Sequence, residues 1–217
     1  MIADKLERIR ELKRRATAFR NRKKYKESLQ LLDTAIADLK DLQKAEDIDE
    51  HEAQAVRAEL ADTYGMKGGV YRRIPELNRA LAEYRCGMQI EDLDKQSTYN
   101  ASNVITLSIS QEHKAPSDPD LSEHLHRVID DLEQKTQAGR SDEWWAWSDL
   151  GQFYLLRNDV DKSRSVYRRA IQTGPTGEEY RRHLDILHEL AAATRESTPD
   201  VSKGISQMLA ELERQTP

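Results

Sequence analysis

Glycine and lysine occur together in the stretch Gly65-Met66-Lys67-Gly68-Gly69. Such a combination can hold a phosphate group when backbone N–H groups and an ammonium surround the anion. A phosphate-binding loop also needs a preceding strand and a Lys-Ser or Lys-Thr ending, and the sequence offers neither. We therefore expect these glycines to permit a close crossing of two helices, and the phosphate loop is the disfavoured alternative.

The other residue types that perform catalysis or bind metals are scattered along the chain. Only His124 and His126 form a tight histidine pair, and residues two apart on a helix point to different faces. Cys86 is the single cysteine, so it has no internal disulfide partner, and its place beside Gly87 favours a small core residue. No GxSxG, HExxH or CxxC pattern is present. The sequence predicts a non-enzymatic protein without cofactor or metal.

Composition restricts the class of protein further. The chain has 217 residues, of which 37% are hydrophobic and 34% charged, and no run approaches the roughly 18 apolar residues of a membrane span. The first residues are charged throughout, so we expect no secretory signal, no membrane contact and a cytoplasmic location. Residues 1–26 carry a balance of +8, which leaves −13 over the rest of the chain.

Apolar residues recur at helical spacing, and only 9 Gly, 6 Pro and 2 Phe interrupt a chain rich in helix-forming residues. Asp118-Pro119, Thr198-Pro199 and Thr176-x-x-Glu179 have the form of helix starts. The pattern predicts an all-α protein of about ten helices in a single domain, 1–217, made of five hairpins at 1–45, 52–92, 97–137, 142–172 and 177–214. After the first hairpin the expected helices are 52–68, 75–92, 97–112, 119–137, 142–156, 160–172, 177–194 and 199–214.

One hairpin carries a specific motif, Trp147-x-x-Leu150-Gly151-x-x-Tyr154. In the same frame, small, aromatic, small and proline positions follow at Ser163, Tyr167, Ala170 and Pro175. The small residues would let two antiparallel helices approach, while Trp147, Tyr154 and Tyr167 fill the space between them. This hairpin resembles the tetratricopeptide repeat (TPR) family. The resemblance implies a right-handed α-solenoid whose first helices line a concave groove.

The same frame fits two other hairpins in part, at Tyr64, Gly68, Tyr71, Ala80, Tyr84 and Gly87, and at Ala16, Phe19, Ser28, Leu32 and Ala35. The third and last hairpins fit poorly, so the array is degenerate, and the atypical last hairpin suits an end cap. The runs YGMKGGVYRR and YNASNVITL also resemble the helical-repeat subgroup found in the TRAFs-binding region of apoptosis signal-regulating kinases.

Groove positions implied by the resemblance collect basic residues at the N-terminal end, at Arg10, Lys13, Arg14, Arg20, Arg72 and Arg73. Guanidinium groups bind carboxylates and phosphates bidentately, which favours an acidic peptide, a C-terminal carboxylate or a phosphate-bearing ligand. A solvated basic face that balances the acidic remainder is the alternative. Lys13 matches one place of the carboxylate clamp of Hsp-binding TPR domains, but Thr17 stands where the clamp has Asn.

Two further candidates for partner binding lie in the fourth hairpin, at Trp145 and Gln152. One of the three tryptophans near 144–147 must point away from the core, and the frame puts Trp145 in the groove. Aromatic anchors dominate interface energetics, so Trp145 would suit a partner side chain. Packing against the neighbouring hairpin is the alternative for this ring.

Together these features predict a TPR-like scaffold or adaptor that binds a protein or peptide partner in a signalling or regulatory assembly. The second hypothesis is a regulatory sensor that holds a nucleotide or other small anionic signal in the basic groove. Nucleic-acid binding is disfavoured because most of the chain is acidic and the basic end lacks stacked aromatics. Self-association is left open.

Overall fold

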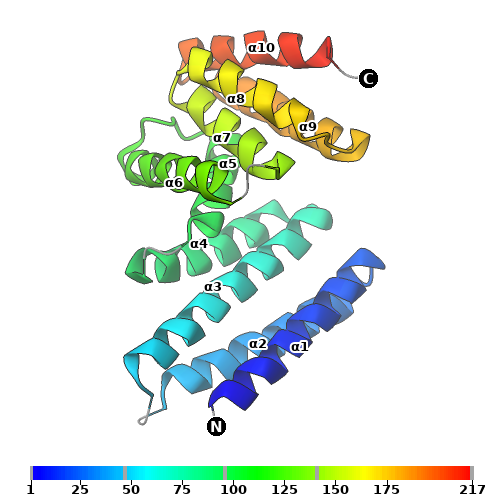
Figure 1. Cartoon of the computed structure of the whole chain (residues 1–217), viewed down its shortest axis with the longest axis vertical. Helices are drawn as coiled ribbons and strands as arrows, with labels where there is room; N and C mark the ends of the chain where they lie inside the picture. Colours follow the sequence, from blue (N-terminus) through cyan, green and yellow to red (C-terminus); the bar gives the residue numbers. More distant parts are fainter. Residues whose placement is uncertain (1, 46–47, 95–96, 140–141, 216–217) are drawn as a thin grey trace. The chain divides into compact units, whose positions relative to one another are not determined.

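A computed structural model describes residues 2–45, 48–94, 97–139 and 142–215, and regular structure within these ranges is helical throughout (Figure 1). The prediction of an all-α chain with ten helices is confirmed for the described residues. Their bounds are α1 (Ile2–Asn21), α2 (Tyr25–Gln43), α3 (Glu50–Arg73), α4 (Leu77–Asp94), α5 (Tyr99–Glu112), α6 (Pro119–Ala138), α7 (Trp144–Leu156), α8 (Val160–Gln172), α9 (Gly177–Ala193) and α10 (Pro199–Glu213).

Short polar side chains fix several helix starts. Thr176 and Glu179 form the predicted capping box at α9, in which the Thr176 N–H donates to the Glu179 carboxylate over 2.8 Å. Asp118 accepts from the Asp120 N–H at α6, directly before Pro119. Thr198 also precedes a proline at the first position of α10, but its side chain makes no capping bond. The residue types that satisfy free N–H groups therefore set most of these boundaries.

Helix α3 is longer than the sequence predicts: it ends at Arg73 and not at residue 68. It continues through Gly68 and Gly69 without a break. A Cβ atom built on Gly68 would lie 2.8 Å from the Tyr84 ring of α4, closer than carbon atoms approach. The glycines thus allow a close helix crossing, as predicted, and do not end the helix.

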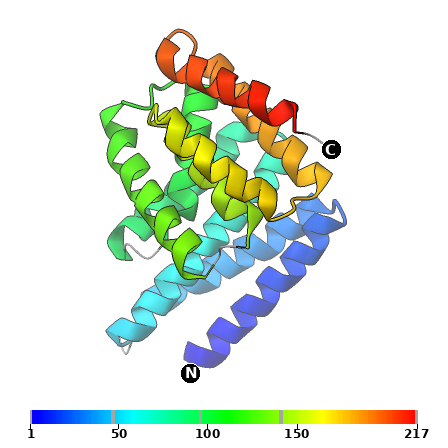
Figure 2. The same cartoon turned by 45° about the horizontal axis from the view of Figure 1, so that its top comes forward.

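The chain forms two compact units, Met1–Val104 and Ile105–Pro217, each described here by itself. In the first unit α1 packs on α2, α2 on α3 and α3 on α4, so two successive hairpins share one core (Figure 2). That core contains buried side chains from three helices, including Ile9, Leu39 and Leu60.

In the second unit α7 pairs with α8 and α9 with α10, while α10 also contacts α7 and α8. The Tyr180 hydroxyl of α9 donates to the Leu212 carbonyl of α10 over 2.8 Å. Trp144, buried to 9% exposure, packs against Tyr180 and His183. That all five hairpins form one domain and one right-handed solenoid stays a prediction.

The first and fourth hairpins repeat the same internal contact. The Ser28 hydroxyl donates to the Ala16 carbonyl over 2.8 Å, and the Ser163 hydroxyl donates to the Gly151 carbonyl over 2.9 Å. A Cβ on Gly151 would lie 2.8 Å from the Tyr167 ring, matching the contact of Gly68 with Tyr84. The predicted frame of small and aromatic positions is confirmed for these contacts.

Trp144 and Trp147 are buried to different depths. Trp147, expected to fill the space between helices, is only half-buried, and the Arg169 guanidinium lies 5.9 Å from its ring centroid. Trp144 is the more deeply buried of the two because it faces Tyr180 in α9.

Candidate functional site

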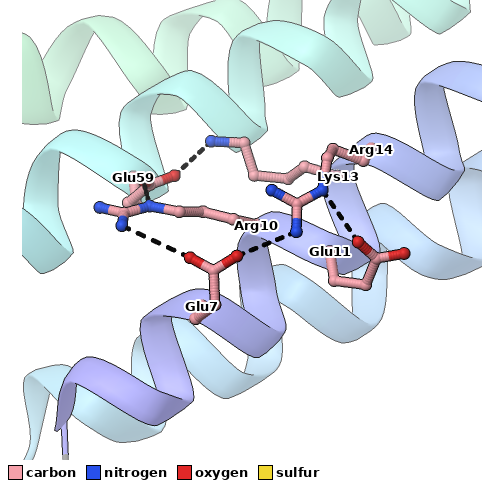
Figure 3. A network of polar contacts seen from close by, with 6 residues as sticks. All are labelled: Glu7, Arg10, Glu11, Lys13, Arg14 and Glu59. Carbon is pink, nitrogen blue, oxygen red and sulfur yellow. Dashed lines mark hydrogen bonds and ion pairs between the residues drawn. The ribbon is translucent and has the colours of Figure 1, made fainter.

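The face of α1 that contacts α3 carries the first of the predicted cations. Arg10 Nε donates to Glu59 Oε1 over 2.7 Å, and Lys13 Nζ donates to the second oxygen of the same carboxylate. Lys13 Nζ also lies 2.5 Å from an Asp62 carboxylate oxygen. Figure 3 shows Glu59 held between the two cations. The surface is slightly hollowed here, and its lining is Arg10, Lys13, Arg14, Thr17 and Met66.

The pKa of the Glu59 carboxylate depends on these contacts. Burial raises its pKa, but hydrogen bonds from Lys13 and Arg10 outweigh burial and bring the pKa below the usual value. In return, the hydrogen bond to Glu59 raises the pKa of Arg10. Glu59 and Arg10 are therefore both ionised near neutral pH.

Arg14 points along α1 and not toward α3. One of its terminal nitrogens lies 2.9 Å from Glu7 Oε1, and its Nε lies 2.8 Å from Glu11 Oε2. Figure 3 shows Glu7 between Arg14 and Arg10. Counting Asp62 and Glu59, four carboxylates surround three cations, so the charge of Arg10, Lys13 and Arg14 is balanced within the protein.

The remaining predicted arginines lie in the last turns of α1 and α3. Arg20 and Arg72 are half-buried and Arg73 is exposed. Among the described residues none of the three forms an ion pair with a carboxylate, and the Arg20 Nε is buried without a hydrogen-bond partner. Burial lowers the pKa of Arg20, and the neighbouring charge of Arg73 lowers it further. We call Arg20, Arg72 and Arg73 the arginine cluster.

Tyrosine and asparagine side chains surround the arginine cluster. An Arg72 terminal nitrogen donates to Asn103 Oδ1 over 2.9 Å. The Tyr84 and Tyr99 rings meet edge to face at 6.3 Å between centroids, and burial raises the pKa of Tyr84 above its usual range. Tyr84 is fully buried, whereas Tyr99 is 49% exposed. The cluster thus has neutral hydroxyl and amide neighbours and an open aromatic ring.

Helix dipoles offset part of the cluster's charge. Each helix carboxyl end carries about half a negative charge, so the ends of α1 and α3 together balance about one of three positive charges. A net charge of about +2 remains at a place with no described carboxylate partner. This distinguishes the cluster from Arg10, Lys13 and Arg14.

Lys67, the lysine of the glycine-rich stretch, forms two ion pairs within the protein. Its Nζ lies 2.8 Å from Asp33 Oδ1 of α2 and 2.7 Å from Glu83 Oε1 of α4, and its side chain is 15% exposed. Burial lowers the pKa of Lys67, but the two carboxylates outweigh burial and raise it. The lysine therefore links three helices, and the phosphate-loop hypothesis gains no support.

The two candidates in α7 have different surroundings. Trp145 is 41% exposed and is the outward tryptophan, as the sequence predicts. Gln152 is 4% exposed, and its amide nitrogen donates to Thr106 Oγ1 over 2.9 Å. Its expected place on an open binding surface is therefore corrected, because its amide is used inside the second unit.

A buried carboxylate that sequence reasoning missed joins α4 to the start of α5. Glu91 accepts from the Asn100 N–H over 3.0 Å, from the Ala101 N–H over 3.2 Å and from the Asn100 side-chain amide over 3.0 Å. Burial raises the pKa of Glu91. A cavity of about 110 Å³ lies beside this carboxylate. Only a glutamate in α4 followed by Tyr99-Asn100 could have indicated this contact, and neither residue type is diagnostic.

Comparisons with known proteins do not assign the chain to a family. No protein-family model matches the sequence, and no curated protein matches it. A crystal structure of nearly identical TPR-like repeats, described as belonging to a Podosopora anserina kinesin light chain, superposes with a TM-score of 0.48 at 18% identity. The match covers 96% of this chain and 92% of the other. The support for a TPR-like arrangement therefore comes from the contacts within the hairpins and not from this similarity.

Within the described ranges, no helix combines the length and the apolar character needed to cross a bilayer. No group of three or more His, Cys, Asp or Glu side chains in the same ranges is arranged to hold a metal ion. The expectation that Cys86 is a core residue is wrong, because its side chain is exposed.

Proposed function

We propose that this chain is a non-catalytic, TPR-like scaffold or adaptor that binds an acidic protein or peptide partner in a signalling or regulatory assembly. The observation that carries the proposal is the arginine cluster. Arg20 and Arg72 come from the first helices of two successive hairpins, so one extended ligand segment would touch both. No described carboxylate pairs with these guanidinium groups, so their charge is available to an anionic ligand.

The surroundings of the cluster favour a polypeptide ligand. Tyr99 offers an aromatic ring beside the cations, and aromatic and arginine side chains are enriched where interfaces gain most of their binding free energy. In the second unit, Trp145 supplies another exposed ring. We treat it as a separate contact for the partner.

The alternative function is a sensor of a nucleotide or another small anionic signal. The same net positive charge favours it, because a free anion needs only the guanidinium groups. The two functions differ in their dependence on ligand length: a scaffold gains affinity from an extended acidic segment, whereas a sensor binds the isolated anion equally well.

Binding measurements with defined ligands test the proposed function. Calorimetry of the full chain with a degenerate Asp- and Glu-rich peptide library is expected to show saturable binding, which Arg20→Gln with Arg73→Gln weakens by about tenfold or more. Arg15→Gln, an exposed arginine of α1 outside the cluster, is the matched control. Saturable binding of nucleotides with no binding of the peptides would favour the sensor and contradict the scaffold.

A further inference from the structure

The arginine cluster has a charge that one carboxylate does not match. Three guanidinium groups meet two helix carboxyl ends, which leaves a net charge of about +2. A carboxylate brings one negative charge and occupies one guanidinium fork. A phosphomonoester brings a charge of about −1.5 to −2 and three acceptor oxygens, enough to contact several guanidinium groups at once.

The geometry around Arg20 supports the same ligand chemistry. Its Nε is buried without a hydrogen-bond partner, at a site where Arg73 adds a second positive charge. Arg72 is oriented by its bond to Asn103, so one guanidinium of the cluster is fixed before any ligand arrives. Preorganised cations lose less conformational entropy on binding than mobile ones.

From this arrangement we propose that the cluster of Arg20, Arg72 and Arg73 recognises a phosphorylated side chain of the partner protein, with Tyr99 packing against the neighbouring peptide. The inference rests on the proposed scaffold function and adds the modification state of the partner to it. Phosphorylation of the partner would then strengthen binding, because the unmodified hydroxyl carries no negative charge and offers the cluster no anionic oxygen.

Arg10, Lys13 and Arg14 provide the internal comparison. These residues lie on the same helix as Arg20, but Glu7, Glu11, Glu59 and Asp62 already balance them. A phosphate arriving there would have to displace protein carboxylates. The inference therefore predicts that phosphate affinity depends on the end of α1 and not on its middle.

The experiment uses fluorescent degenerate peptides with a fixed central phosphoserine, phosphothreonine or phosphotyrosine, together with Glu-substituted and unmodified versions. Fluorescence anisotropy with the full chain is expected to give at least about tenfold tighter binding of one phosphorylated library than of its Glu version. Arg20→Gln with Arg73→Gln should abolish that preference, while Arg15→Gln should retain it. Thermal unfolding of each variant checks that the fold is intact, and Arg73→Lys, which keeps the charge, should lose less than Arg73→Gln.

Competition identifies the source of the phosphate. Inorganic phosphate and nucleotides are expected to displace the phosphopeptides only weakly, because they lack the peptide contacts. Nucleotides that bind more tightly than every phosphopeptide would overturn the inference in favour of a small-molecule signal. Equal binding of phosphorylated and Glu-containing libraries would overturn it too but leave the proposed function intact, whereas no binding of any peptide would overturn both.

Discussion

His183 gives the second unit a pH-dependent stability. The imidazole is 6% exposed and lies against the Tyr167 and Trp144 rings, with its Nε2 atom 2.8 Å from the Tyr167 hydroxyl oxygen. Burial lowers the pKa of His183 from 6.5 to about 4. The unfolded chain therefore takes up a proton at a higher pH than the folded chain does, and acid favours unfolding.

The magnitude follows from the two pKa values. Well above pH 6.5 both states are neutral and His183 adds no pH dependence, whereas the stability loss grows as the pH falls through 6.5 toward 4. The loss is about 2 kcal/mol near pH 5 and approaches about 3 kcal/mol below pH 4.

Urea unfolding of the wild type and of His183→Gln at about pH 7.5 and about pH 5 measures this effect. The glutamine removes the titration and keeps an amide near Tyr167. We expect the difference in unfolding free energy between the two proteins to shift by about 2 kcal/mol between these pH values, against the wild type at the lower pH. His51→Gln, at an exposed histidine in the first turn of α3, is the control. A wild-type-to-variant difference independent of pH would refute the reasoning.

Three further predictions concern packing and buried charge, each measured as the free energy of unfolding in urea. Gly151→Ala should lower the free energy of unfolding by about 1 to 2 kcal/mol, because overpacking against the Tyr167 ring outweighs the gain in helix propensity. Gly177→Ala is the control and should not destabilise the chain, because the space around Gly177 is open. Glu91→Gln should lower the free energy of unfolding by about 1 to 3 kcal/mol, because the amide has one acceptor oxygen for three donors. An unchanged urea midpoint would show that these hydrogen bonds add nothing to stability. Lys67→Met should lower the free energy of unfolding by about 1 to 2 kcal/mol, because the Asp33 and Glu83 carboxylates lose their partner. The loss is smaller than for a fully buried ion pair, and a gain in stability would contradict the stabilising role of Lys67.

Helix positions were accessible from the sequence because their determinants are local. The capping box of Thr176 and Glu179 spans four residues, and Pro119 directly follows the residue that caps its helix. The extension of α3 was not accessible, because Gly68 weakens a helix by propensity alone. Only the Tyr84 ring on the next helix explains why the glycine lies inside α3.

The sequence predicted which basic residues belong to the candidate site, but not which of them are neutralised by carboxylates. Lys13 and Glu59 are 46 residues apart, and their ion pair depends on how α1 and α3 are rotated about their axes. The resemblance to the TPR frame gave Arg14 and Arg20 the same role in the groove. The structure separates them because Glu7 and Glu11 reach Arg14 on its own helix, whereas no described carboxylate pairs with Arg20. For the same reason the burial of Gln152 was not predictable, since Thr106 lies on a different helix.

The central claim is that the arginine cluster, and not the balanced cations of α1, receives the anionic ligand. Side-chain NMR of the arginine Nε–Hε groups during titration of the full chain with the acidic and phosphorylated peptide libraries tests it directly. We predict that the resonances of Arg20, Arg72 and Arg73 shift saturably while those of Arg10 and Arg14 stay in place. Shifts confined to Arg10 and Arg14, or none at any of the five arginines, would contradict it.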